Sequence, residues 1–225
     1  LQWFVGANER SGGASYSGFL KNIQSEALAN MSEDERKLLA GEYVFTPPKE
    51  EDLPKPAGPG KRWTLEEVVG LANAGLTGRD FDNGKKMFAA AKCLSCHRFD
   101  GTGGSTGPDL SNVAGRFSNK DLGEAIIHPS KVISDQYRAM NIVTVNGQVL
   151  AGRVTSETEK EITILTDPVD ATKLVTLAKG DVDEMLPSKL SLMPDKLLNT
   201  LNKDEVLDLL AFLKSRGNPN AIEFK

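Results

Sequence analysis

The sequence predicts a mainly α-helical fold with a small antiparallel β-sheet inserted between helices. Apolar residues recur at helical spacing near both ends of the chain, most clearly after Asn202. Between these ends, the pair Asn146-Gly147 joins two β-rich runs, and this dipeptide is a strong signal for a two-residue hairpin. We therefore expect one β-sheet, with helices before and after it in the sequence.

Composition limits the class of protein. The chain has 225 residues, of which 39% are hydrophobic and 26% charged, as in ordinary globular proteins. A formal net charge of −4 argues against nucleic acid or an anionic membrane as partner. No run of about twenty apolar residues occurs, so we expect no membrane span in this chain.

The first 61 residues are expected to precede the main domain. Apolar residues from Phe19 to Leu28 predict one helix, and Ser32 with Glu35 forms a capping box for a second. We interpret residues 1–45 as a helical N-terminal segment, the remnant of an upstream domain. Residues 46–61 contain five prolines and predict a stiff, solvated linker.

The main domain is expected over residues 62–225, and capping residues mark its helices. Thr64 begins one helix, a second runs from about Asp82 toward Cys93, and Ser118 caps a short helix that ends before Pro129. Asn202, with Glu205 at the third helical position, begins the last helix.

The β insertion is expected at about residues 136–179. Its predicted strands cover residues 137–145, 148–155, 161–165 and 174–177. The period of the hydrophobic pattern changes here from helical to alternating, so this region forms a sheet.

The segment Cys93-Leu94-Ser95-Cys96-His97 holds both cysteines and one of the two histidines. CxxCH is the attachment motif of a c-type haem. On a helical turn the two thiols can form thioether bonds to the vinyl groups of one porphyrin. His97 follows directly and would be the proximal iron ligand, since a neutral imidazole nitrogen is a good donor to iron.

Three other interpretations of this motif are weaker. A zinc site needs further Cys or His ligands, and only His128 remains elsewhere. A thioredoxin-like centre needs a preceding strand, whereas residues 82–91 predict helix. A structural disulfide closing so small a loop would stabilise the fold little. The glycines from Gly101 to Gly107 lack the phosphate-loop pattern, so we expect them to pack against the flat macrocycle.

The sixth ligand decides between an electron carrier and a haem enzyme. Met31 precedes the linker, and Met87 lies on the helix before the motif. Met140 falls in a predicted strand. Met185 is credible on distance, but burial in a helix or turn would explain it equally. Met193 lies in an irregular loop before Pro194, from which its thioether can reach iron.

These motifs resemble class I cytochrome c. The resemblance rests on Asp82-Asn83-Gly84 to Phe88, Cys93 to His97, Gly107 to Leu110, Met193-Pro194 and Leu209 to Leu213. More narrowly, Ile127 to Ser130, the β insertion and Pro187-Ser188 resemble the haem-binding domain of the Pirellula/Verrucomicrobium type, over about Thr77 to Gly217.

The resemblance implies a cytochrome c-like helical haem domain with one covalently attached haem c. It implies that Met193 is the distal ligand and that the carbonyl of Pro108 fixes the tautomer of His97. It also places Gly84 where the first and last helices cross. His128 departs from the narrower pattern and leaves a bis-histidine site open as an alternative.

The leading functional hypothesis is a one-electron carrier with His97 and Met193 as axial ligands, itself non-catalytic and part of a larger oxidoreductase. By resemblance, a fused or neighbouring dehydrogenase donates the electrons, and a respiratory cytochrome or oxidase accepts them. The alternatives are a haem enzyme or gas-binding domain with a vacant or labile sixth position, and an interaction module whose sheet docks a partner.

Haem attachment outside the cytoplasm also predicts a location. The chain begins at Leu1 without an initiator Met or a leader. We therefore expect an export signal upstream of it and a periplasmic or otherwise exported protein.

Overall fold

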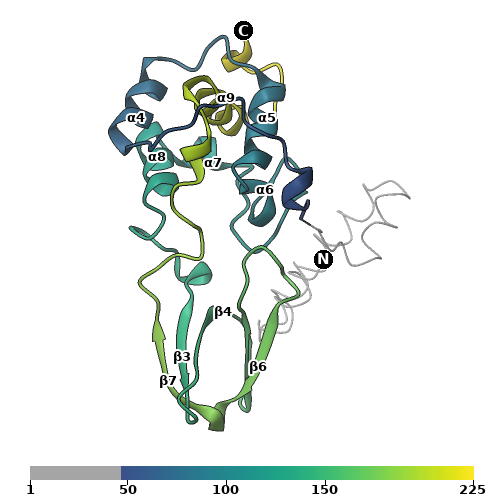
Figure 1. Cartoon of the computed structure of the whole chain (residues 1–225), viewed down its shortest axis with the longest axis vertical. Helices are drawn as coiled ribbons and strands as arrows, with labels where there is room; N and C mark the ends of the chain where they lie inside the picture. Colours follow the sequence, from purple (N-terminus) through teal and green to yellow (C-terminus); the bar gives the residue numbers. More distant parts are fainter. Residues whose placement is uncertain (1–46) are drawn as a thin grey trace, which may run out of the picture. The chain divides into compact units, whose positions relative to one another are not determined.

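The computed structural model describes residues 47–225, which belong to one compact unit, Thr46–Lys225. The predicted helical segment 1–45 lies outside the described residues. Within the described part, every helix is too short or too polar to cross a bilayer. A helical layer lies at one end of this unit and a β-sheet at the other (Figure 1).

The helical layer is built from six α-helices in the described residues. They are α4 (Leu65–Ala74), α5 (Phe81–Ala90), α6 (Cys93–Cys96), α7 (Val113–Arg116), α8 (Asn119–Ile127) and α9 (Lys203–Lys214). Short 3₁₀ helices connect the larger elements: η1 (Glu50–Asp52), η2 (Asp135–Tyr137), η3 (Lys179–Asp181), η4 (Leu197–Thr200) and η5 (Ile222–Phe224).

Side-chain caps determine where the longer helices begin. The hydroxyl of Thr64 accepts from the backbone N–H of Glu67, and the Glu67 carboxylate accepts from the N–H of Thr64. Asn202 and Glu205 form the same reciprocal pair at the start of α9. These boxes satisfy backbone donors that a helix leaves unpaired at its first turn. The predicted starts of α4 and α9 are confirmed.

The helical core forms where α5 crosses α9. A Cβ added to Gly84 would lie 2.4 Å from the carbonyl oxygen of Asp208 and 2.8 Å from Cβ of Phe212. Only glycine allows the two backbones to approach this closely. The Phe212 ring lies 5.9 Å from that of Phe88 and 4.8 Å from that of Phe99, between ring centroids. The predicted close crossing at Gly84 is confirmed.

The Pro-rich strap, residues 47–60, is packed along the helical layer. The backbone N–H of Ala57 donates to Glu205 at 2.5 Å, and the Asn202 side chain donates to the carbonyl of Gly58 at 3.2 Å. A Cβ on Gly60 would lie 2.1 Å from the carbonyl oxygen of Asn199. The prediction of a solvated linker is therefore wrong for these residues. The five prolines argue against an α-helix or a β-strand in this segment. They carry no information about its contacts with residues about 145 positions away in the sequence.

The sheet is antiparallel, with strand order β6-β5-β4-β3-β7. Its strands are β3 (Met140–Thr144), β4 (Val149–Glu157), β5 (Glu161–Leu165), β6 (Leu174–Ala178) and β7 (Val182–Pro187). The β3–β4 hairpin turns at Asn146-Gly147, so its predicted place is confirmed. Its loop has three residues and not two, because the Thr144 N–H donates to the Gln148 carbonyl. Gly147 alone has a positive φ, 77°, whereas a two-residue type I′ turn needs two such residues. A second core, centred on Ile142, Ile162 and Ile164, lies within the sheet.

The sheet is larger than expected. Strand β7 pairs with β3, with Met185 opposite Ile142, so the inserted sheet continues to Pro187 and not to about residue 179. Two adjacent acidic residues, Asp183 and Glu184, and the proline give this segment a weak strand signal of its own. Consequently "mainly α" describes the helical layer, and the whole described unit combines helices with a five-stranded sheet.

Candidate functional site

The CxxCH segment is one short helical turn, held between two bends of the backbone. Helix α5 ends at Ala90, and Lys92 adopts a left-handed conformation with φ of 62° before α6 begins at Cys93. The N–H of His97 donates to the carbonyl of Cys93 at 2.9 Å, after which the backbone becomes extended. Both cysteines are free thiols on this turn.

The two thiols have different surroundings. Burial raises the pKa of the Cys93 thiol to about 12. Burial also raises the pKa of Cys96, whose sulfur donates to the carbonyl of Pro168 at 3.2 Å. The hydroxyl of Thr106 donates to the same carbonyl at 2.5 Å. Both thiols are therefore neutral at pH 7, and the β5–β6 loop reaches the turn that carries them.

His97 is oriented by a backbone carbonyl. Its Nδ1 lies 2.8 Å from the carbonyl oxygen of Pro108, the contact that the resemblance implied. A carbonyl can only accept, so Nδ1 carries the proton and Nε2 keeps its lone pair for a metal. Burial lowers the pKa of His97, which keeps the ring neutral near pH 7. This is the protonation state that an iron ligand requires.

The glycines after His97 pack on the CxxCH turn itself. A Cβ on Gly107 would lie 2.8 Å from Cε1 of the His97 ring. Added Cβ atoms on Gly103 and Gly104 would lie 2.2 Å from the carbonyl oxygens of His97 and Ser95. We expected these glycines to pack against the macrocycle. Instead, Gly103, Gly104 and Gly107 allow the loop after His97 to pack against the CxxCH turn and the His97 ring.

A tight strand pair begins this loop. Strand β1 (Arg98–Phe99) pairs with β2 (Thr102–Gly103). The two residues between them, Asp100 and Gly101, have φ of 48° and 75°, as a type I′ hairpin turn requires. The hairpin turns the chain back, so that Gly107 and Pro108 meet the His97 ring.

Met193 belongs to a second group of residues. It is half-buried and lines a cavity of about 680 Å³ together with His128, Pro129, Leu190 and Ser191. This volume is within the range of ligand pockets. In Figure 1 the yellow-green segment leading into η4 and the helix α6 flank the junction between helical layer and sheet from two sides.

Hydrogen bonds hold the Met193 loop in place. The Met193 N–H donates to the Ser191 hydroxyl at 3.1 Å, and the Ser191 N–H donates to Ser130 at 3.0 Å. The N–H of buried Ser188 donates to the carbonyl of Ala139 at 2.8 Å, which attaches the loop to the start of β3. The structure thus joins the segments around His128 and Met193, which are distant in sequence.

The other methionines of the described residues have packing roles. Met87 is buried in the helical core, and Met140 and Met185 border the sheet core. Met31 lies outside the described residues. Among the described residues, no group of three or more His, Cys, Asp or Glu side chains is arranged to hold a metal ion.

Comparison with known proteins indicates the class of this domain. Residues 81–163 match the family model for cytochrome c. The match supports a c-type cytochrome. Its cofactor is haem c, attached covalently and containing iron. The match begins at the first residue of α5 and ends before Met193 and α9. No curated protein matches the chain.

The residues of the cytochrome c domain fit this cofactor. Two free thiols occupy one helical turn, and a neutral histidine with an available Nε2 follows them. Two neighbours of the thiols, Thr106 and the carbonyl of Pro168, were not predicted from the sequence. Thr106 lies near the motif in sequence, but Pro168 is 72 residues from Cys96 and carries no local signal.

Proposed function

We propose that this chain is a one-electron carrier in which His97 and Met193 are the axial ligands of haem c iron. The observation that supports it most is the hydrogen bond from His97 Nδ1 to the Pro108 carbonyl, 2.8 Å long. This hydrogen bond fixes the tautomer in which Nε2 carries no proton, so that Nε2 can only accept a hydrogen bond or bind a metal. Haem c supplies the redox centre, and thioether ligation favours its ferrous form.

The chain's own residues would position both ligands in advance. The Pro108 carbonyl and the close packing of Gly107 hold the His97 ring in one orientation. Ser191 and Ser130 hold the Met193 loop through backbone N–H groups. Ligands that are already in place need little rearrangement when the charge at iron changes, which suits electron transfer.

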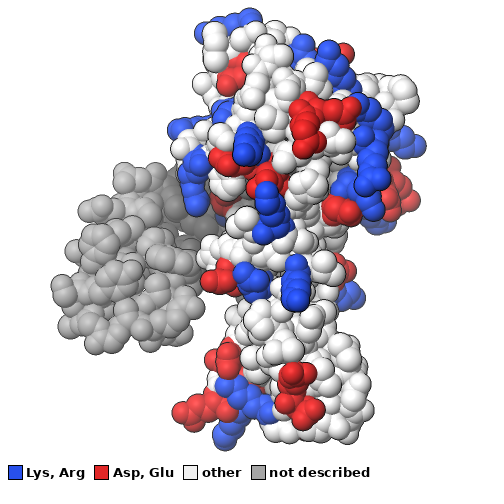
Figure 2. Space-filling view, turned by 90° about the vertical axis from the view of Figure 1, so that its left-hand side faces the viewer, with Lys and Arg blue, Asp and Glu red and all other residues white. Residues whose placement is uncertain are grey.

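We also propose the place of the domain in a reaction sequence. A fused or neighbouring dehydrogenase would donate electrons, and a respiratory cytochrome or oxidase would accept them. The likeness to the Pirellula/Verrucomicrobium type supports this arrangement, and so does covalent haem attachment, which takes place in exported proteins. On the face in Figure 2, acidic and basic side chains are interspersed, so no field of one sign dominates partner choice there.

Replacement of each candidate ligand tests the axial assignment. In Met193→Ala we expect loss of the ferric absorption band that reports sulfur bound to iron, with haem still attached. His128→Ala should keep this band because His128, although it lines the same cavity, is exposed at the end of α8. Met185→Ala is the matched control, since Met185 packs against the sheet core.

One outcome would reverse the assignment. If Met193→Ala keeps the sulfur-to-iron band and His128→Ala abolishes the low-spin spectrum, the bis-histidine alternative replaces ours. The shared cavity is the observation that makes His128 the second candidate. A haem enzyme or gas-binding domain differs again: its ferrous form would bind carbon monoxide rapidly in the unaltered protein.

A further inference from the structure

We infer that Arg153, on strand β4, binds a propionate carboxylate of haem c, so that the inserted sheet contributes to the haem site. This inference rests on the haem attachment described above. The first observation is a buried donor of a half-buried arginine. The Nε atom of Arg153 is buried, and the described residues offer it no hydrogen-bond partner.

Within the described residues, Arg153 forms no ion pair. Its guanidinium carbon lies 5.4 Å from the centroid of the Tyr137 ring. Arg79 also has a buried Nε without a partner, but its Nη1 lies 3.1 Å from Asp204 and 3.8 Å from Asp208. A buried donor without a partner is costly. The Nε of Arg153 therefore suits an acceptor that the described polypeptide does not supply, and its positive charge favours an anionic one.

The register of the sheet places Arg153 near the cytochrome c motif. Arg153 is paired with Leu165 on β5, only three residues before Pro168, whose carbonyl accepts from the Cys96 thiol at 3.2 Å. Three residues of extended chain span at most about 11 Å. An arginine side chain at this register can therefore approach the macrocycle attached to Cys96, whose propionates lie on the edge opposite its vinyl groups.

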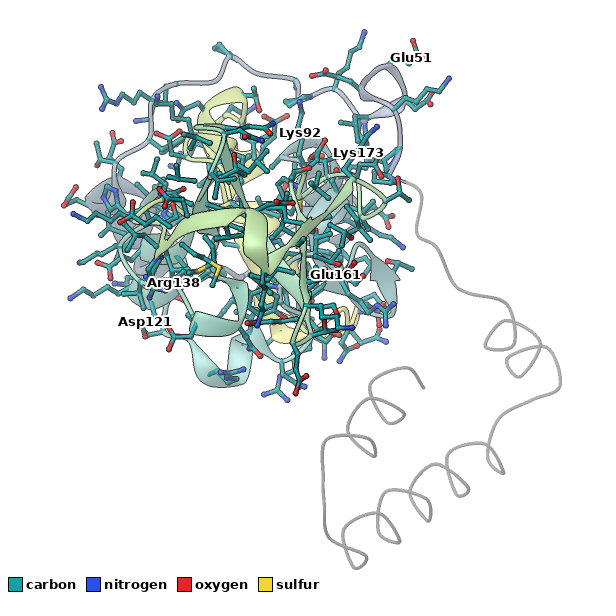
Figure 3. The ribbon with its side chains drawn as sticks, turned by 90° about the horizontal axis from the view of Figure 1, so that it is seen from below. Glu51, Lys92, Asp121, Arg138, Glu161 and Lys173 are labelled. Carbon is teal, nitrogen blue, oxygen red and sulfur yellow. The ribbon has the colours of Figure 1, made fainter. Side chains whose placement is uncertain are left out.

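Strand β3 connects the sheet to the loop that carries Met193. Strand β3 lies next to β4, and the carbonyl of Ala139, just before β3, accepts from Ser188. Ser188 is five residues before Met193. In the view from below in Figure 3, Lys173 and Lys92 project on one side of the unit, and Arg138 and Asp121 on the other. The end of the sheet that carries Arg153 is thus connected to both groups of candidate ligands.

The chemistry of haem matches this position. Haem carries two propionate carboxylates besides the vinyl groups that the thiols of Cys93 and Cys96 use. A guanidinium binds a carboxylate through paired N–H donors, and the Tyr137 ring supports its flat face. A cation held there keeps the propionate ionised, since an opposite charge within 4–6 Å lowers a carboxyl pKa by about 1–3 units. It also stabilises the ferrous state relative to the more positive ferric state.

Redox titration over a range of pH tests this inference. In Arg153→Gln we expect a lower reduction potential and a redox-linked pKa higher by about 1–3 pH units. Arg153→Lys should stay closer to the unaltered protein because it keeps the charge. The control is Arg138→Gln, whose guanidinium already donates to Ile133 at 3.0 Å and lies 3.3 Å from Asp135. Arg138→Gln should change the reduction potential and the redox-linked pKa less than Arg153→Gln does.

Each outcome has a distinct meaning. If Arg153→Gln and Arg138→Gln titrate alike while both retain haem and the Met193 band, the inference fails and the electron carrier stands. If the unaltered protein carries no haem by mass, both fail. Should Arg153→Gln not fold, Tyr137→Leu tests the same point: it keeps the cation but removes its support. A smaller shift in the same direction is expected, and unaltered values would contradict the inference.

Discussion

Cys93 and Cys96 lie at the two ends of α6, yet their sulfurs differ in environment. The pKa of Cys93 is raised to about 12 by burial, from an ordinary value of 9.0. Burial also raises the pKa of Cys96, but a hydrogen bond with the Thr106 side chain counteracts part of this increase. Because only the thiolate is nucleophilic, their reactivity should differ before haem is attached.

This difference can be measured in the haem-free chain at pH 8. We expect Cys93 to react with iodoacetamide roughly 100-fold or more slowly than an exposed cysteine, because its thiolate fraction falls about tenfold for each unit that its pKa rises. Its rate should still increase about tenfold between pH 10 and 11, where an ordinary thiol with a pKa of 9.0 is already largely ionised. Peptide mass spectrometry gives the rate at each cysteine.

The same labelling in denaturant is the control, since unfolding removes the burial that raises the pKa. Both cysteines should then react at similar rates. A Cys93 rate that is equal in the native and denatured chains would show that the site is open before haem is attached.

At the scale of elements, the crossing of α5 and α9 depends on Gly84. A Cβ at this position would lie within 3 Å of the α9 backbone and of Phe212. We expect Gly84→Ala to lower the free energy of unfolding by about 1–3 kcal/mol, the usual cost of overpacking a core. Chemical denaturation of the haem-bound protein measures it.

Gly70 provides a matched control within α4. Nothing lies within 4 Å of a Cβ added there, so Gly70→Ala should be neutral or stabilise the protein by up to about 1 kcal/mol. If both alanine variants unfold at the same denaturant concentration, the α5–α9 contact does not limit stability.

On the scale of the whole molecule, we expect haem attachment not to require the five-stranded sheet. The CxxCH turn is built by α5, the β1–β2 hairpin and the loop through Pro108, none of which belongs to the sheet. Replacing residues 137–187 by a short Gly-Ser linker should therefore leave haem attached. We expect a lower reduction potential, because the cofactor becomes more exposed when the Pro168 loop is removed.

Intact mass and redox titration measure the two effects. Val149→Ser is the control, since Val149 is 69% exposed near the hairpin tip and should not affect the potential. A deletion that abolishes haem attachment would mean that the sheet is needed to form the site. The deletion must extend to Pro187, because removal of residues 136–178 alone would leave β7 without its partner β3.

Much of the fold follows from local signals. The caps at Thr64 and Asn202 and the Asn146-Gly147 hairpin are where the sequence predicted them, since each depends on residues within a few positions. Strand β7 was missed because its own residues favour a strand only weakly. Its pairing with β3 supplies what local propensity lacks.

The sequence alone determined the chemistry of attachment: two thiols and a histidine within five residues form a haem c motif whatever surrounds them. Only the tertiary structure decided what meets that motif. It brought the Pro168 carbonyl to Cys96, placed Met193 and His128 at one cavity, and left the buried Nε of Arg153 without a hydrogen-bond partner among the described residues. Such contacts join residues far apart in the chain, and they depend on packing and strand register, which no local pattern encodes.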